Sequence, residues 1–182
     1  MSWESDIALG IVSGRLPHAT GRFYDSNITS TTTTFVLVAN TLYAVPIMIP
    51  KTNTYTTESL EVSVLAGGKT MRYGIYTDTN GAPNALVLDS GTTSAGSTGA
   101  RSITISQQLT AGWYWMAVVC DGTPTVRALT TSPLPWLGFS SGTDTTFHAG
   151  WSVAFTYAAL PNPFTGGGAL MTTAAPRLML AI

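Results

Sequence analysis

The chain is 182 residues long and carries few charges, with nine acidic residues, eight basic residues and a formal net charge of −1. Its length suits one domain with a real hydrophobic core. The charged fraction is 9%, against about 25% in an average soluble domain. Because a net charge near zero promotes association, the composition favours a subunit that works inside an assembly. The alternative is a secreted, Thr-rich β-domain.

The same composition disfavours several other classes of protein. The basic residues are scattered singly, which argues against a nucleic-acid-binding surface. No apolar run reaches the roughly 18 residues that a membrane helix needs. Residues 1–6 lack the basic region of a signal peptide, so we expect synthesis in a cytoplasm. The single cysteine, Cys120, excludes internal disulfides, and its place at the end of an apolar run predicts a packed thiol.

Residues 1–22 differ from the rest of the chain. Four apolar residues gather there, Ile7, Leu9, Ile11 and Val12, but glycines and a proline interrupt the segment before a long helix can form. We expect an extended arm that docks onto its own domain or onto a neighbouring protein. The alternative is a first edge strand.

From residue 23 onward, short apolar segments separated by turn residues predict a series of β-strands. The expected strands cover residues 35–38, 42–49, 60–64, 71–76, 86–88, 102–106, 113–119, 126–129, 151–157 and 177–182. Pro46 places the second of them at a sheet edge or a bulge, and Asn80-Gly81 predicts a tight turn. The pattern predicts an all-β protein, a jelly-roll-like antiparallel β-sandwich (residues 23–182) with an extended N-terminal arm (residues 1–22).

One expected strand, residues 113–119, is apolar on both faces. Side chains alternate along a strand, so Trp113 and Trp115 face one way, with Ala117 and Val119, while Tyr114 and Met116 face the other, with Val118. One face is expected to pack against the second sheet of the sandwich. The other face needs cover from a chain segment or from a neighbouring subunit, and we interpret Trp113, Tyr114, Trp115 and Met116 as a core or interface strand.

Several motifs between residues 71 and 124 resemble a β-sandwich domain of tailed-bacteriophage virion proteins. The motifs are Met71-Arg72-Tyr73-Gly74-Ile75-Tyr76, Gly81-Ala82-Pro83, Asp89-Ser90-Gly91, Gly112-Trp113-Tyr114-Trp115 and Asp121-Gly122-Thr123-Pro124. The likeness extends from about residue 22 to the C-terminus and consists of packing and turn residues. It implies a virion setting, among tail, capsid-decorating or fibre proteins. Such domains look like carbohydrate-binding sandwiches and tend to form trimers in phage appendages.

Candidate carboxylates for glycoside hydrolysis give little support to an enzyme. Glu58 and Glu61 are close in sequence, and both look like solvated residues at a strand edge. Leu60, Val62 and Val64 alternate with Glu61 and Ser63 and are expected to face the core. We therefore expect no catalytic pair here.

The remaining reactive residues also favour structural roles. His18 and His148 lie in the arm and in a loop, and no nucleophile-elbow pattern accompanies them. Cys120 beside Asp121 is interpreted as structural, because no His or Cys pair has the spacing of zinc ligands. Asp78 opens a sequence with a faint likeness to a calcium loop, but the later bidentate Glu is missing. We expect no catalytic residue, no metal and no cofactor.

Three loop aromatics, Tyr24, Trp136 and Phe139, are candidates for stacking on sugar rings. Loop aromatics in a sandwich more often cover the core or anchor an interface. The leading hypothesis is a non-enzymatic phage virion structural protein, a homotrimer attached to other virion proteins through its N-terminal arm and made in the host cytoplasm. The alternative is a carbohydrate-binding module for host surface glycans, and a hydrolase is the third hypothesis. Neither nucleic acid nor membrane is an expected partner.

Overall fold

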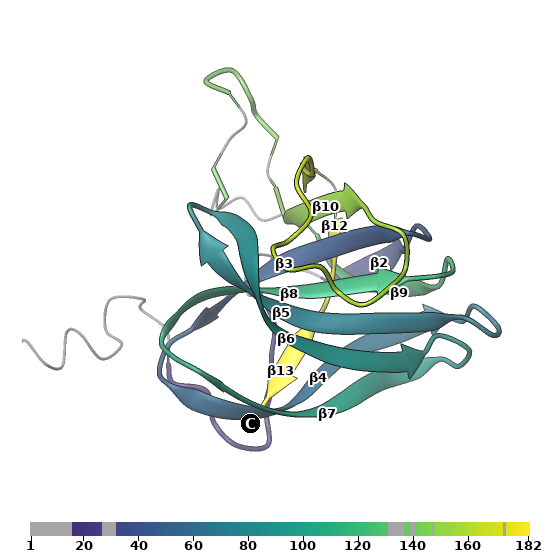
Figure 1. The fold of residues 1–182 in the computed structure, drawn as a ribbon, viewed down its shortest axis with the longest axis horizontal. Coiled ribbons are helices and arrows are strands. Elements are labelled where there is room, and N and C mark those ends of the chain that lie inside the picture. Colours follow the sequence, from purple (N-terminus) through teal and green to yellow (C-terminus); the bar gives the residue numbers. More distant parts are fainter. Residues whose placement is uncertain (1–15, 27–31, 131–136, 139–140, 147, 173) are drawn as a thin grey trace, which may run out of the picture.

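The computed structural model describes residues 16–26, 32–130, 137–138, 141–146, 148–172 and 174–182. Within these ranges the chain forms thirteen β-strands and no helix, arranged as two antiparallel sheets packed face to face (Figure 1). The expected all-β sandwich is confirmed. None of the described segments is a helix that could span a membrane. The expected anchoring residues Ile7, Leu9, Ile11 and Val12 lie outside the described residues.

The first sheet has six strands in the order β11-β10-β3-β8-β5-β6. Their bounds are β3 Thr41–Ile49, β5 Thr70–Thr79, β6 Ala82–Ser94, β8 Gly112–Cys120, β10 Gly150–Ala154 and β11 Ala169–Met171. The expected strand with two apolar faces, residues 113–119, is part of β8, which lies in the middle of this sheet between β3 and β5. We call this six-stranded layer the β8 sheet.

The second sheet has seven strands and contains both ends of the described chain. Its members are β1 Phe23–Tyr24, β2 Thr32–Val36, β4 Asn53–Val64, β7 Gly99–Leu109, β9 Thr125–Thr130, β12 Ala174–Pro176 and β13 Met179–Ala181. β4 and β9 pair directly only near Val62 and Val64. Beyond that point the C-terminal segment lies between them, with β12 paired to β9 and β13 paired to β4 (Figure 1). We call this layer the β4 sheet.

Pro46 lies where β3 has only one hydrogen-bonded neighbour. β10 pairs with β3 from Thr41 to Ala44, whereas β8 pairs with it along Leu42 to Ile49. The missing N–H of Pro46 therefore breaks no ladder on the free side. The expected edge position is correct for this half of β3, although the strand as a whole is internal.

The expectation that Val64 faces the core is wrong. Its register with β9 shifts after Val62, so that Val62 pairs with Val126 while Val64 pairs with Thr125. The irregularity turns Val64 outward, and its side chain is 58% exposed. Such bulges change the face that a side chain takes, and the apolar alternation of the sequence does not reveal them.

The main core lies between the two sheets. Alternate residues of β3, β5 and β8 point inward from the β8 sheet, and residues of β4, β7, β9 and the C-terminal segment meet them from the β4 sheet. Its buried members include Tyr43, Ile47, Ile49, Tyr55, Leu60, Met71, Tyr73, Ile75, Met116, Val126 and Leu180. The predicted alternation of β8 is confirmed, since Met116 and Val118 belong to this core.

A second core covers the opposite face of β8. Trp115, Ala117 and Val119 pack there with Leu160 and Phe164, which belong to the segment 155–168 that follows β10. We call this segment the cover segment. Its backbone is tied down at both ends, because Phe155 N donates to Asn40 O at 2.9 Å and Phe164 N donates to Asn84 O at 2.7 Å. The second apolar face of β8 is therefore covered by the chain itself.

Gly74 on β5 permits the close approach of the cover segment. A Cβ atom at this position would collide with Leu160 Cδ1 and would lie 2.6 Å from the carbonyl oxygen of Leu88. Only glycine lets Leu160 rest on the sheet at this point.

The last residues of the expected arm pack against the β4 sheet. His18 is buried, its Nδ1 lies 2.7 Å from the Tyr55 hydroxyl, and its ring stacks on Tyr24 with centroids 3.7 Å apart. β1 then pairs with β13 through Phe23 and Tyr24. Contact with the sandwich thus begins a few residues before the expected boundary at residue 22.

Candidate functional site

A pocket lies beside the N-terminal end of β8. It has a volume of about 240 Å³ and is lined by Pro46, Asp78, Gly81, Trp113, Trp115 and Leu137. We call it the Trp113 pocket. Its described walls are mostly apolar, and Asp78 is the one ionisable residue among them. This combination of aromatic walls with a few fixed polar groups is typical of small-molecule binding sites.

Strand register brings these residues together. On β8, Trp115 lies between Pro46 of β3 and Tyr76 of β5. Trp113 precedes it by two residues and therefore lies on the same face of the sheet. Trp115 is buried, whereas Trp113 is only partly buried. Of the two Trp side chains that line the pocket, Trp113 is therefore the more exposed.

Asp78 is held by the turn that joins β5 and β6. Asn80 and Gly81 both have positive φ, at 54° and 77°, as the sequence predicted for a tight hairpin. Gly81 N donates to Asp78 Oδ2 at 3.3 Å, and Trp115 Nε1 donates to Asp78 Oδ1 at 2.8 Å. A carboxylate offers about four lone-pair sites. Asp78 is therefore fixed in orientation and still has capacity to accept hydrogen bonds from a ligand.

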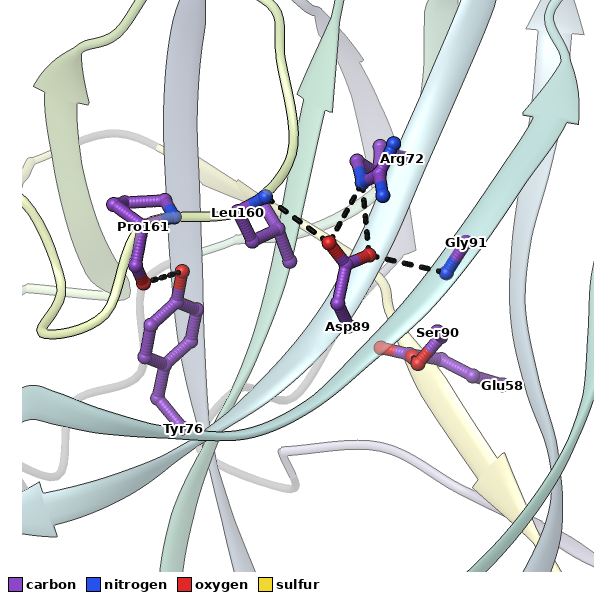
Figure 2. A network of polar contacts seen from close by, with 8 residues as sticks. All are labelled: Glu58, Arg72, Tyr76, Asp89, Ser90, Gly91, Leu160 and Pro161. Carbon is purple, nitrogen blue, oxygen red and sulfur yellow. Dashed lines mark hydrogen bonds and ion pairs between the residues drawn. The ribbon is translucent and has the colours of Figure 1, made fainter.

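A second polar cluster surrounds Asp89 on β6, under the cover segment (Figure 2). Arg72 Nε donates to both carboxylate oxygens of Asp89, at 2.8 and 2.9 Å. Gly91 N and Leu160 N donate to the same carboxylate at 3.2 and 3.1 Å. The hydrogen bond to Asp89 raises the pKa of Arg72. This cluster attaches the cover segment to the sheet, which is a structural role.

The expectation that Glu58 is a solvated strand-edge residue is wrong. Glu58 is fully buried in the space between the sheets, and its Oε2 accepts a hydrogen bond from Ser90 Oγ at 2.6 Å (Figure 2). Burial raises the pKa of its carboxyl from 4.5 to about 8. Glu58 lies two and four positions before Leu60 and Val62 on β4, so all three side chains face the same side of the sheet. This alternation is the signal that could have placed Glu58 in the core.

Glu61 is separated from Glu58 by its position on β4. It lies 3.2 Å from Arg127 Nε, and its side chain is 41% exposed. For Glu61 the expected solvated position is confirmed. One carboxylate is buried and the other is open to solvent, so the two do not form an acid pair across a common cleft.

The remaining reactive side chains are spread over separate elements. Cys120 is buried and accepts a hydrogen bond from Gly122 N at 3.3 Å, and burial raises the pKa of its thiol. The expected packed thiol is confirmed. His148 lies just before β10, with Nε2 3.2 Å from Asp144 Oδ2. In the part of the chain that the structure describes, no three His, Cys, Asp or Glu side chains are grouped to hold a metal.

The expected glycan contacts are not brought together by the described structure. Tyr24 lies on β1 in the β4 sheet, stacks on His18 and accepts a hydrogen bond from Ala19 N at 2.7 Å. Trp136 and Phe139 lie outside the described residues. The Trp113 pocket is instead lined by Trp113 and Asp78. The sequence placed Trp113 in a core or interface strand and Asp78 in a turn.

The four residues of the expected core or interface strand fall into two groups. Trp115 and Met116 are buried on opposite faces of β8. Trp113 and Tyr114 are partly buried, and the Tyr114 hydroxyl lies 2.9 Å from Thr110 Oγ1. The N-terminal end of β8 therefore lines the pocket, and the strand is buried in the cores from Trp115 onward.

No family model matches the chain, and no curated protein matches it either.

Proposed function

We propose that the chain is a non-enzymatic structural subunit of a tailed-phage virion, acting in capsid decoration, in a head fibre or in the tail, and working as an oligomer. The observation that carries the proposal is the low charge of the chain, since only 9% of its residues are charged. Among the described residues, five charged side chains are directed to contacts within the chain. They are Glu58, which is buried, and the pairs Arg72–Asp89 and Arg177–Asp25. The virion setting itself rests on the resemblance described above.

Exposed apolar side chains at one end of the β4 sheet support the oligomeric part of the proposal. Val36 of β2 and Val64 of β4 both pair with Thr125 of β9 and therefore lie on either side of it. They are 53% and 58% exposed, and Val38 and Leu65 next to them are 56% and 50% exposed. We call these four residues the valine row. Burial against other subunits would remove this apolar area from water.

The second apolar face of β8 no longer supports an oligomer. Leu160 and Phe164 of the same chain cover it. The case for association therefore rests on the low charge and on the valine row.

Measurement of the composition of purified phage particles tests this proposal. Particles from the source host are purified by density and quantified by mass spectrometry, and they are labelled with antibodies raised against the chain. We expect the chain in a fixed ratio to the major capsid protein, with label on the particle surface. A chain that remains in the host lysate and is missing from intact particles would overturn the proposal.

A carbohydrate-binding module is the second candidate, and one observation favours it. The Trp113 pocket places a partly buried Trp beside an oriented carboxylate. This is the arrangement of an accessible aromatic with a polar group that a sugar site requires. The two candidates are compatible, because a virion surface protein can also bind glycans.

A further inference from the structure

We infer that the Trp113 pocket binds one neutral pyranose ring, which stacks on Trp113 and donates hydroxyl hydrogen bonds to Asp78. The inference deepens the second candidate function above, on which it rests. It assigns a ligand class and names residues other than the loop aromatics that the sequence suggested.

The size of the pocket limits the ligand to one ring. Its volume is about 240 Å³, below the roughly 300–1,000 Å³ of sites for drug-sized ligands. The pocket is formed by Pro46 of β3, by the end of β5 and the turn that follows it, by the start of β8 and by Leu137. Sites on strands are more rigid than sites on loops, so most of the pocket exists before a ligand arrives.

The polar side of the ligand must donate hydrogen bonds. Asp78 is an acceptor whose orientation is already set by Trp115 Nε1 and Gly81 N. A wholly apolar ligand would strip water from this carboxylate without replacing its hydrogen bonds, which is costly. Two neighbouring hydroxyl groups satisfy the remaining lone pairs of Asp78.

The charge of the pocket selects among sugars. Asp78 is the only charged residue among the described residues that line it, and none of the Lys or Arg residues that the structure describes lines it. A sialic acid, a uronic acid or a sugar phosphate would bring a second negative charge beside Asp78, which is unfavourable. The pocket therefore selects neutral hexoses and N-acetylhexosamines over anionic sugars.

The apolar side of the ligand must be a flat C–H face. Trp113 lines the pocket and is partly buried, while Trp115 is 1% exposed and its indole nitrogen donates a hydrogen bond to Asp78. A quaternary ammonium ligand prefers a cage of several aromatic faces. A single partly exposed indole, that of Trp113, beside the acceptor Asp78 therefore suits a pyranose ring better than a quaternary ammonium ligand.

Saturation-transfer NMR and titration with simple glycosides test the inference on the full chain. The probes are the methyl glycosides of glucose, galactose, mannose and N-acetylglucosamine, with methyl N-acetylneuraminide as the anionic probe and choline as the cationic probe. We expect a neutral glycoside to bind with a Kd on the order of 1 mM, as suits a ligand of this size. It should shift the indole Nε1–H resonance of Trp113.

Two variants and two matched controls locate the site. Trp113→Ala and Asp78→Asn should each weaken binding at least about tenfold, a loss typical of one well-made contact. Asp78→Asn keeps an oxygen for Trp115, so it tests the inference even if Trp113→Ala does not fold. Phe23→Ala and Glu61→Gln alter an exposed aromatic and an exposed acid on the β4 sheet. Both controls should bind as the parent chain does.

Several results would overturn the inference. They are a folded parent chain that binds no neutral glycoside, binding that survives both pocket variants, and a preference for the anionic probe or for choline. These failures are separate from failure of the proposed function. A chain that is built into virions and binds no sugar refutes only the pocket inference.

Discussion

Glu58 and Asp89 show how one side-chain position decides the chemistry of a carboxylate. Asp89 faces the cover segment and accepts hydrogen bonds from Arg72, Gly91 N and Leu160 N. Glu58 faces the main core, where Ser90 is its one hydrogen-bond partner among the described residues and its Oε1 has none. Burial without an opposite charge favours the neutral acid, so Glu58 holds a proton at neutral pH.

This proton makes the stability of the fold depend on pH. The pKa of Glu58 is about 8 in the folded chain against an ordinary 4.5, so between these values the folded state binds more proton than the unfolded state. The contribution is fully present below about pH 4.5 and is lost as the pH rises through about 8. The slope is at most about 1.4 kcal/mol per pH unit.

We predict that Glu58→Gln is increasingly more stable than the parent chain as the pH rises from 5 to 9. Gln keeps an oxygen for Ser90 and has no proton to lose. Urea unfolding at several pH values measures the difference in free energy of unfolding. Glu61→Gln serves as the control, because its side chain is 41% exposed, and it should follow the parent chain. Parallel curves for Glu58→Gln and the parent would contradict the pKa assigned to Glu58.

At the scale of elements, the cover segment is the feature that completes the β8 sheet. β8 is apolar on both faces, and residues 155–168 fold back over the second face, where Leu137 also packs. Polar contacts hold the segment, including Leu160 N to Asp89 and the Tyr76 hydroxyl to Pro161 O at 3.0 Å. The segment is therefore part of the domain core.

We predict that Leu160→Ala lowers the free energy of unfolding by about 2–5 kcal/mol, the range for Leu→Ala changes in a packed core. Leu160 is 6% exposed, whereas Leu16 is 86% exposed. Leu16→Ala is the matched control and should change stability by less than about 0.5 kcal/mol. Chemical denaturation of both variants measures the effect. Equal stabilities would mean that the cover segment contributes no packing energy.

The sequence predicted most strands where apolar residues alternate or run together, as in β3, β5 and β8. It missed the first half of β4, residues 53–59, because that stretch is rich in Thr and Ser and has no apolar alternation. It also missed β11 and β12, which lie within a Gly- and Pro-rich region. Hydrogen bonds to neighbouring strands hold these segments, and a local pattern does not contain that information.

The Trp113 pocket was not predictable for a related reason. Asp78 and Trp113 are 35 positions apart, and each has an ordinary local explanation, one as a turn residue and one as a strand residue. Only the pairing of β5 with β8 brings them together. The burial of Glu58, by contrast, was predictable, because its side chain faces the same side of β4 as Leu60 and Val62.

At the scale of the whole molecule, the chain is a charge-poor sandwich with a row of exposed apolar side chains. We predict that the purified chain is an oligomer at micromolar concentration and that Val36→Ser with Val64→Ser lowers its mass toward a monomer. Both residues are more than half exposed, so the change should leave the fold intact. Light scattering after size exclusion measures the mass, with Leu16→Ser as the control. A monomeric parent chain would contradict the prediction for the isolated protein.

A second prediction about the whole molecule concerns its N-terminal residues. The apolar residues between Ile7 and Val12 are too few and too interrupted to form a core of their own. Removal of residues 1–15 spares His18 and its contact with Tyr55. We predict a folded chain with unchanged β content that no longer joins phage particles. Circular dichroism and particle composition measure the two properties, and normal incorporation would show that these residues are not the anchor.

If the chain is a virion subunit, as we propose, copies of it form part of the particle surface. A cryo-EM difference map between normal phage particles and particles made without the chain tests this proposal. We expect extra density on the normal particles, repeated by symmetry, into which copies of the two-sheet sandwich fit with the valine row turned toward neighbouring density. Identical maps from the two kinds of particle would contradict it.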